Sequence, residues 1–151
     1  MIQEEKQVLF KDLCSRLPYG VKMKVNDSLY GDIIVIPHSF IDMDSFDCHT
    51  EDFKYEQLYS IEEVIPYLRP ISSMTDKEMD MLFNILNIDV DEDEDWIKIN
   101  DVSGIRFYFP SGKWIEDVIE VYDYLNSIHI DYRGLINKKL ALEAPKGMYN
   151  K

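Results

Sequence analysis

The chain has 151 residues, of which 46% are hydrophobic and 30% are charged. That length is usual for one domain, and the composition is globular rather than disordered or collagen-like. Sixteen basic residues against 29 acidic residues give a formal net charge of -13, which argues against a nucleic-acid backbone or an anionic membrane as the direct partner.

The beginning of the chain predicts a helix followed by a strand. Apolar residues at helical spacing favour a helix over residues 3–17, and Pro18 and Gly20 end it. Strict alternation of apolar and polar residues over 21–25 then indicates a strand with one buried face.

Further short strands follow up to residue 59. Residues 29–36 have the pattern of a second strand, which Pro37 is expected to end. Residues 39–47 form a polar loop or a short strand, and residues 53–59 alternate like another strand. Three or four short strands joined by turns are typical of a small curled antiparallel sheet, such as an SH3-like partial barrel.

Two segments have the sequence of a capping box, in which a serine or threonine is followed three positions later by glutamate. Ser60 with Glu63 predicts a short helical turn through residues 64–68. Thr75 with Glu78 predicts an amphipathic helix that reaches residue 86. Both pairs therefore predict helical N-termini.

The last third of the chain predicts two strands and two helices. Residues 96–100 and 105–109 alternate like an antiparallel pair, and apolar residues from 114 to 125 lie on one face of a helix. Asp131 is placed to cap a short helix over residues 132–139. The tail after residue 140 has no regular period.

These elements together predict an α+β fold. A helix and a small antiparallel sheet occupy residues 1–74, and a helix–strand–strand–helix part occupies residues 75–151. The boundary lies where Pro70, Ser72, Ser73 and Thr75 cluster. The two parts either pack as one unit or fold separately.

Four phrases spread over the chain carry a resemblance to known sequences. They are RLPYGV at residues 16–21, PYLRPISSMT at 66–75, DYRGLI at 131–136 and ALEAP at 141–145. Together they resemble a set of small, acidic, uncharacterised proteins of gut bacteria and of phage or prophage-like regions. The resemblance implies an accessory or mobile-element context, and it carries no catalytic residue onto this chain.

An acidic run is the most visible feature of the second half. Six of the seven residues from 89 to 95 are acidic, and Asp89, Asp91, Asp93 and Asp95 alternate like oxygen ligands of a divalent cation. An EF-hand loop needs glycine at its sixth position and glutamate at its twelfth, where this chain has Glu94 and Asn100. A solvated loop is the simpler interpretation.

The residues that carry most catalytic chemistry show no recognisable arrangement. His38, His49 and His129 are scattered, whereas zinc sites usually pair their ligands in sequence. Cys14 and Cys48 each lack the setting that activates a nucleophile. We therefore expect no catalytic residue, no cofactor and no metal, the four aspartates above being the weak metal candidates.

Two tyrosine–arginine phrases are candidates for contact with a partner. Tyr67 and Arg69 precede Pro70, and Tyr132 and Arg133 follow Asp131. An arginine held beside an aromatic residue outside regular structure often anchors a loop by bonding carbonyls or a carboxylate. The other interpretation is that these four residues contact a partner, since tyrosine and arginine are enriched at interfaces.

The sequence predicts a class of function and no specific activity. The first expectation is a protein–protein interaction module with a basic partner that the acidic run attracts. One alternative is an acidic mimic of DNA that inhibits a DNA-binding protein, and another is an enzyme without a recognisable motif. The absence of a signal peptide and of any run of about 18 apolar residues predicts a cytoplasmic protein with no membrane partner.

Overall fold

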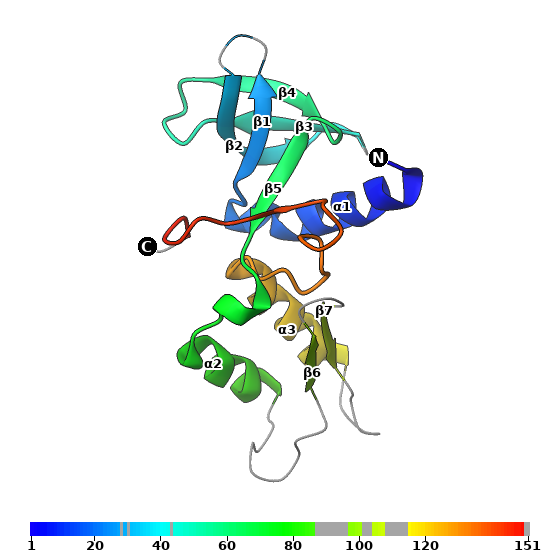
Figure 1. Cartoon of the computed structure of the whole chain (residues 1–151), viewed down its shortest axis with the longest axis vertical. Helices are drawn as coiled ribbons and strands as arrows, with labels where there is room; N and C mark the ends of the chain where they lie inside the picture. The colour runs from blue at the N-terminus through cyan, green and yellow to red at the C-terminus, as the bar shows by residue number, and fades with distance from the viewer. Residues whose placement is uncertain are drawn as a thin grey trace.

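The fold is seen in a computed structural model that describes residues 1–27, 29, 31–42, 44–86, 97–100, 104–107 and 115–149. For residues 86, 97–100, 104–107 and 115–118 the description covers the backbone alone. A sheet lies at one end of the molecule and helices α2 and α3 lie at the other, with helix α1 beneath the sheet (Figure 1). The protein is therefore α+β, as the sequence predicts.

Helix α1 spans Gln3–Arg16 and confirms the first prediction. At its N-terminus the Ile2 amide donates a 2.9 Å hydrogen bond to the Glu5 carboxylate. A short 3-10 helix, η1 (Leu17–Tyr19), follows, and Gly20 then turns the chain with a φ of +67°, a conformation that favours glycine.

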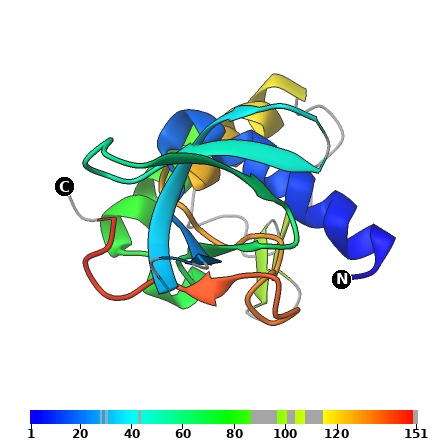
Figure 2. The ribbon, with the colours of Figure 1, turned by 90° about the horizontal axis from the view of Figure 1, so that it is seen from above.

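Six strands form a sheet in the order β4-β3-β2-β1-β5-β8. All neighbours are antiparallel except β5 and β8, which are parallel. The strands curve around a common core (Figure 2). Their bounds are Met23–Asp27 for β1, Gly31–Phe40 for β2, Ser45–His49 for β3, Glu56–Ser60 for β4, Val64–Leu68 for β5 and Leu142–Glu143 for β8.

One face of this sheet buries the larger core, because period-2 alternation sends every second side chain inward. Helix α1 closes it with Leu9 and Leu13, which are fully buried. The sheet contributes these buried side chains to the core cluster: Met23, Val25, Val35, Phe46, Cys48, Tyr59, Val64 and Leu68.

Pro37 does not end β2, contrary to the sequence prediction. The strand continues to Phe40, and its register with β3 shifts between Pro37 and Ser39. Such a shift is a β-bulge, where the missing amide of a proline is tolerated. Residues 39–47 thus contain the end of β2 and the start of β3.

The helical turn predicted for residues 64–68 is also wrong, because this segment is strand β5. Val64, Pro66 and Leu68 are buried in alternation. The amide of Tyr67, between the last two, donates to the Lys22 carbonyl at 2.8 Å. The Ser60 amide does donate to Glu63 at 2.8 Å, but this contact closes a turn between β4 and β5 rather than a helix. Pairing with β1 decides the conformation.

Between residues 75 and 127 the described elements agree with the sequence prediction. Helix α2 spans Asp76–Leu86, and its capping box forms: the Thr75 amide donates to Glu78 at 2.8 Å and the Glu78 amide to Thr75 at 3.3 Å. Strands β6 (Ile97–Asn100) and β7 (Gly104–Phe107) pair antiparallel, and helix α3 spans Ile115–Ser127. A second core cluster joins these helices through Leu82, Val121, Leu125, Ile130, Tyr132 and Ile71.

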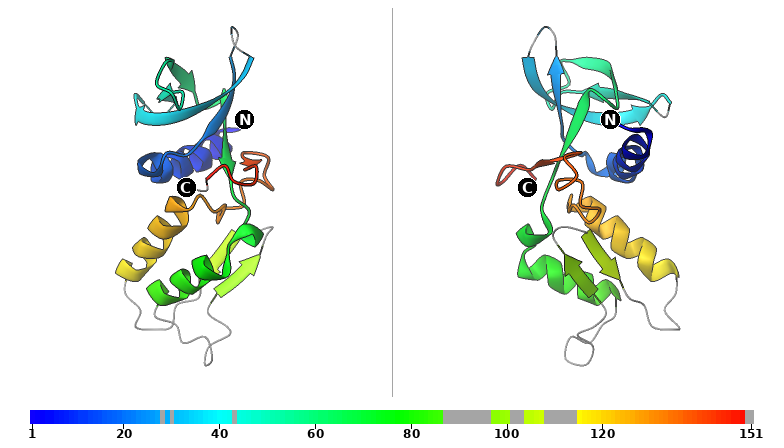
Figure 3. Two further views of the ribbon diagram at one scale, coloured as in Figure 1. Left: turned by 90° about the vertical axis from the view of Figure 1, so that its left-hand side faces the viewer. Right: turned by 45° about the vertical axis from the view of Figure 1, so that its right-hand side comes forward.

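The C-terminal segment returns from α3 to the sheet (Figure 3). The short helix predicted over residues 132–139 is wrong, since turns replace it and Gly134 and Lys139 both have positive φ. Asp131 still accepts two backbone amides, from Leu135 at 2.7 Å and from Ile136 at 2.8 Å. The division into residues 1–74 and 75–151 stays a prediction. Across the described residues, no helix combines the length and the apolarity needed to cross a membrane.

Candidate functional site

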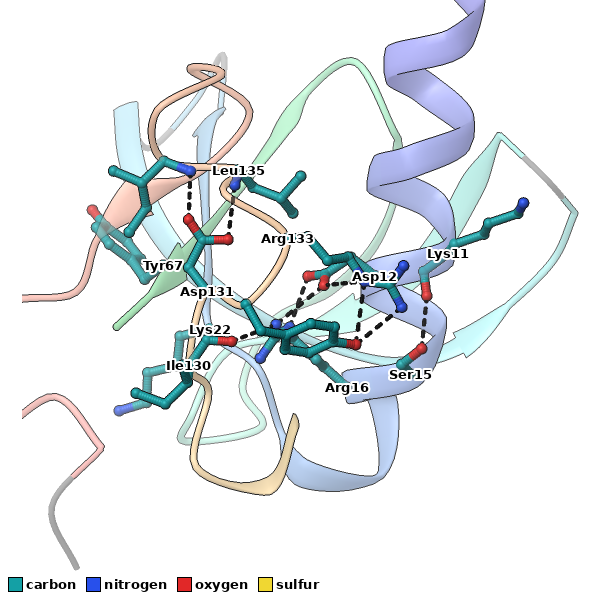
Figure 4. A network of polar contacts seen from close by, with 12 residues as sticks. Lys11, Asp12, Ser15, Arg16, Lys22, Tyr67, Ile130, Asp131, Arg133 and Leu135 are labelled. Atoms are coloured by element: carbon teal, nitrogen blue, oxygen red, sulfur yellow. Dashed lines mark hydrogen bonds and ion pairs between the residues drawn. The ribbon is translucent and has the colours of Figure 1, made fainter. Parts of the chain in front are cut away.

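A buried ion pair on α1 contacts the segment that returns from α3 (Figure 4). Asp12 and Arg16 lie one helical turn apart, and both side chains are fully buried. The Arg16 guanidinium donates to the Asp12 carboxylate at 2.7 and 3.1 Å and to the Ile130 carbonyl at 2.9 Å. The pair therefore holds the backbone just before the predicted residues Tyr132 and Arg133.

Tyr132 and Arg133 complete this cluster. The Arg133 guanidinium lies 3.2 Å from the Asp12 carboxylate and donates to the Tyr132 hydroxyl at 3.0 and 3.2 Å. Guanidinium carbons of Arg16 and Arg133 lie 5.4 and 5.0 Å from the centre of the Tyr132 ring, within cation–π range. Tyr132 is 5% exposed, so these contacts are internal ones.

Arg69 joins three parts of the chain just after β5. Its guanidinium bonds both oxygens of Glu78 at 2.7 and 2.9 Å and donates to the carbonyls of Ser73 at 2.9 Å and Ile128 at 3.3 Å. Hydrogen bonding to Arg69 is the main cause that lowers the pKa of Glu78 to about 2. The anchoring interpretation of Arg69 is thus confirmed.

Tyr67 lies two residues earlier on β5, beside β8. Its carbonyl accepts a 2.7 Å hydrogen bond from the Tyr149 hydroxyl, which itself accepts from the Lys22 amide at 3.0 Å. The four residues predicted to contact a partner therefore all contact, or belong to, the returning segment 128–149. Their role in contacting a partner stays a prediction.

A cleft of about 750 Å³ lies where this segment meets the end of β5. Four charged residues line it, and they form two ion pairs: Lys22 with Glu51, and Arg69 with Glu78. Charges paired in this way already have their electrostatic partners within the protein. A catalytic centre would be indicated by unpaired charges that converge in the cleft, and the charged residues described in its lining are paired instead.

His129 also lines this cleft, and sequence reasoning did not single it out. It is 4% exposed and its ring stacks on Tyr149 with 3.8 Å between the ring centres. Burial, followed by the positive charge of Arg16, lowers the pKa of His129 to about 3. The imidazole is therefore neutral at pH 7. No local sequence pattern predicts that His129 is buried, because tertiary packing produces its burial.

A second group that the sequence did not reveal lies on the outer face of the sheet. His38 on β2, Asp47 on β3 and Glu56 on β4 place one ligand atom each within 4.8 Å of one another. Nine positions separate His38 from Asp47 and again Asp47 from Glu56, a spacing that is informative only once the two hairpins are known. The four aspartates predicted as weak metal candidates, Asp89, Asp91, Asp93 and Asp95, lie outside the described residues.

Helix α3 has two partly exposed apolar side chains, Ile119 and Tyr122, and the Tyr122 ring also packs against the buried Tyr132 with 5.1 Å between the ring centres. Ile119 is 62% exposed and Tyr122 is 37% exposed, whereas Val121 on the same helix is fully buried. The acidic residues Glu120 and Asp123 next to them are exposed as well. Helix α3 thus presents apolar area bordered by negative charge.

Comparisons with known proteins found no matching family model, no matching curated protein and no matching solved structure.

Proposed function

We propose that this protein is a cytoplasmic protein–protein interaction module of an accessory or phage-derived locus, and that its partner is a basic protein. The observation that carries the proposal is the exposed face of α3. There Ile119 and Tyr122 offer apolar contact area, and Glu120 and Asp123 border it with negative charge. Interfaces commonly combine such an apolar centre with a polar rim.

The net charge of -13 supports a basic partner. Charge complementarity accelerates encounter and excludes acidic competitors, and it weakens as salt screens the charges. The apolar contacts of Ile119 are less sensitive to salt. The proposed interface therefore combines a salt-dependent attraction with a salt-resistant contact.

An interaction role accounts for the molecule better than an enzymatic one. The cleft beside His129 is lined by charges that are paired with one another, and the buried His129 is neutral at pH 7 because its pKa is lowered to about 3. A general acid or base works best with a pKa near the operating pH.

We also propose the SH3-like description for strands β1–β5. It is supported by the strand order β4-β3-β2-β1-β5, in which the fifth strand returns to pair with the first. The ten-residue strand β2 pairs with both β1 and β3 and contains the bulge that lets it bend.

The proposal is tested by capturing partners with two matched variants of the full chain. Ile119→Asp places a charge in the proposed interface. Ile41→Asp is the control, because Ile41 is 61% exposed but follows β2 at the other end of the molecule. Tagged proteins are incubated with lysate of the source organism at low and high salt, and bound proteins are identified by mass spectrometry.

We expect a basic protein that binds the wild type and Ile41→Asp, that is lost with Ile119→Asp, and that binds more weakly at high salt. Retention by Ile119→Asp, or no reproducible partner at either salt concentration, would overturn the proposal. A DNA-binding protein displaced by DNA, with Ile119→Asp still binding, would instead favour the DNA-mimic alternative.

A further inference from the structure

We propose that His38, Asp47 and Glu56 bind a divalent transition-metal ion, for which Zn²⁺ is the probe. The His38 Nε2 atom lies 3.0 Å from Oε1 of Glu56 and 3.5 Å from Oδ2 of Asp47. One imidazole nitrogen and two carboxylate oxygens thus converge on one point of the outer sheet face. This inference concerns a site separate from the proposed interface on α3.

The separations of these atoms suit a metal ion of zinc's size. Zinc binds histidine nitrogen and carboxylate oxygen at about 2.0–2.2 Å, so two ligand atoms at tetrahedral angles lie about 3.4 Å apart. The two distances from His38 Nε2, 3.0 and 3.5 Å, bracket that value. An ion at the centre of the group takes the place of the proton between Nε2 and Glu56. The neutral imidazole then carries its proton on Nδ1 and coordinates through the Nε2 lone pair.

The local fold explains why these three side chains meet. The β-bulge between Pro37 and Ser39 adds His38 as an extra residue on β2, and bulges often redirect a side chain in this way. On β3, Phe46 and Cys48 are buried, so Asp47 between them points to the outer face. Glu56 begins β4 and pairs with His49, two residues along β3 from Asp47.

A contribution to the stability of the fold does not explain why His38, Asp47 and Glu56 lie together. Its side chains are 39%, 30% and 65% exposed for His38, Asp47 and Glu56, and exposed ion pairs contribute little to stability. Two carboxylates held within 4.8 Å of each other repel, and a divalent ion relieves that repulsion.

The ligand set selects the class of ion. Imidazole nitrogen favours first-row transition ions, whereas Ca²⁺ and Mg²⁺ prefer oxygen ligands throughout. Three protein ligands and an exposed position leave room for water as a further ligand, which is the open form of a zinc site. The expected order of affinity is therefore Zn²⁺ well above Mg²⁺ and Ca²⁺.

His49 provides a matched control. Its ring lies 5.5 Å from that of His38 and stacks on Phe53 at 4.1 Å, and its Nδ1 donates to the Thr50 carbonyl at 2.8 Å. It is a histidine on the same face of the sheet, yet it is outside the group of three converging ligand atoms. Loss of zinc binding in His38→Ala but not in His49→Ala therefore separates ligation from general histidine content.

The experiment is calorimetric titration of the metal-free full chain with ZnCl₂ near neutral pH, and then with MgCl₂. Variants are His38→Ala, Asp47→Asn, His49→Ala and a chain in which the four aspartates from 89 to 95 become asparagine. Side-chain ¹⁵N NMR of the histidines reports ligation directly. Thermal melts without metal show whether each variant folds.

We expect one tight zinc equivalent in the wild type, in His49→Ala and in the asparagine variant. Affinity falls more than about 100-fold in His38→Ala and Asp47→Asn, which exceeds the loss that changes in supporting residues usually cause. Zinc shifts the Nε2 resonance of His38. Unchanged affinity in His38→Ala, equal loss in His49→Ala, loss in the asparagine variant, magnesium binding as tight as zinc, or no shift of His38 Nε2 would each overturn the proposal.

Discussion

The buried His129 predicts that the protein loses stability in mild acid. In the folded state its pKa is lowered from 6.5 to about 3, first by burial and then by the charges of Arg16, Arg69 and Lys22, against a raising contribution from a hydrogen bond with the Tyr19 backbone. The unfolded chain exposes the same imidazole with a pKa of about 6.5. Below that pH the unfolded state binds a proton that the folded state does not, so stability falls as pH falls from about 6.5 towards 3.

The size of this effect follows from the two pKa values. Each pH unit between them costs about 1.4 kcal/mol for a single site. With a folded value of about 3 and an unfolded value of 6.5, the stability attributable to His129 falls by about 2 kcal/mol between pH 7 and pH 5. That is a large fraction of the stability of an ordinary domain.

The assay compares urea unfolding of the wild type with that of His129→Asn at pH 7 and at pH 5. Asparagine does not titrate, and it tolerates the positive φ of 59° at this position. Every other titrating group is common to both proteins, so the difference in their pH dependence isolates His129. A differential loss smaller than about 0.5 kcal/mol, within the range of ordinary surface changes, would refute the reasoning.

Three further substitutions test the packing. Asp12→Ala leaves the charge of Arg16 unpaired in a site where both side chains are 0% exposed. Urea denaturation should show that the free energy of unfolding falls by about 3–5 kcal/mol. A fall below about 1 kcal/mol would contradict a buried pair. Glu78→Gln removes the charge that Arg69 bonds and should cost about 1–2 kcal/mol at pH 7. This loss should shrink as pH falls from 4.5 towards 2, where the wild-type carboxyl protonates, and a pH-independent loss would count against the pair. Phe46→Ala, at 0% exposure, should cost about 3–5 kcal/mol in thermal or urea unfolding, and equal losses in the 75%-exposed control Phe53→Ala would contradict the assigned core.

The sequence predicted helices α1, α2 and α3 because their signals are local. Apolar residues three and four positions apart define a buried helical face, and Thr75 with Glu78 forms a cap from residues of the same turn. Strict alternation likewise revealed β1 and the β6–β7 pair, since a strand with one buried face needs that pattern. The neighbours of Arg69 suggested loop anchoring as one of two interpretations, and its bonds to Glu78 and to the Ser73 carbonyl agree with that one.

Tertiary contacts decided the remaining elements, because their partners are distant in sequence. Residues 64–68 are a strand only because β1 and β8 pair with them, and a serine–glutamate capping signal just before them pointed to a helix instead. The tail has no periodic pattern, yet Leu142 and Glu143 complete the sheet. Here the pairing energy of neighbouring strands outweighs local preference.

The candidate sites show the same division. The sequence alone determined an acidic α+β protein and selected tyrosines and arginines that hold the returning segment. Only the folded sheet, with its bulge at Pro37 and Ser39, brings His38 to Asp47 and Glu56 across three strands. Only packing buries His129 and changes its pKa. Local patterns record which residues prefer which backbone, whereas convergence and burial arise when distant segments meet.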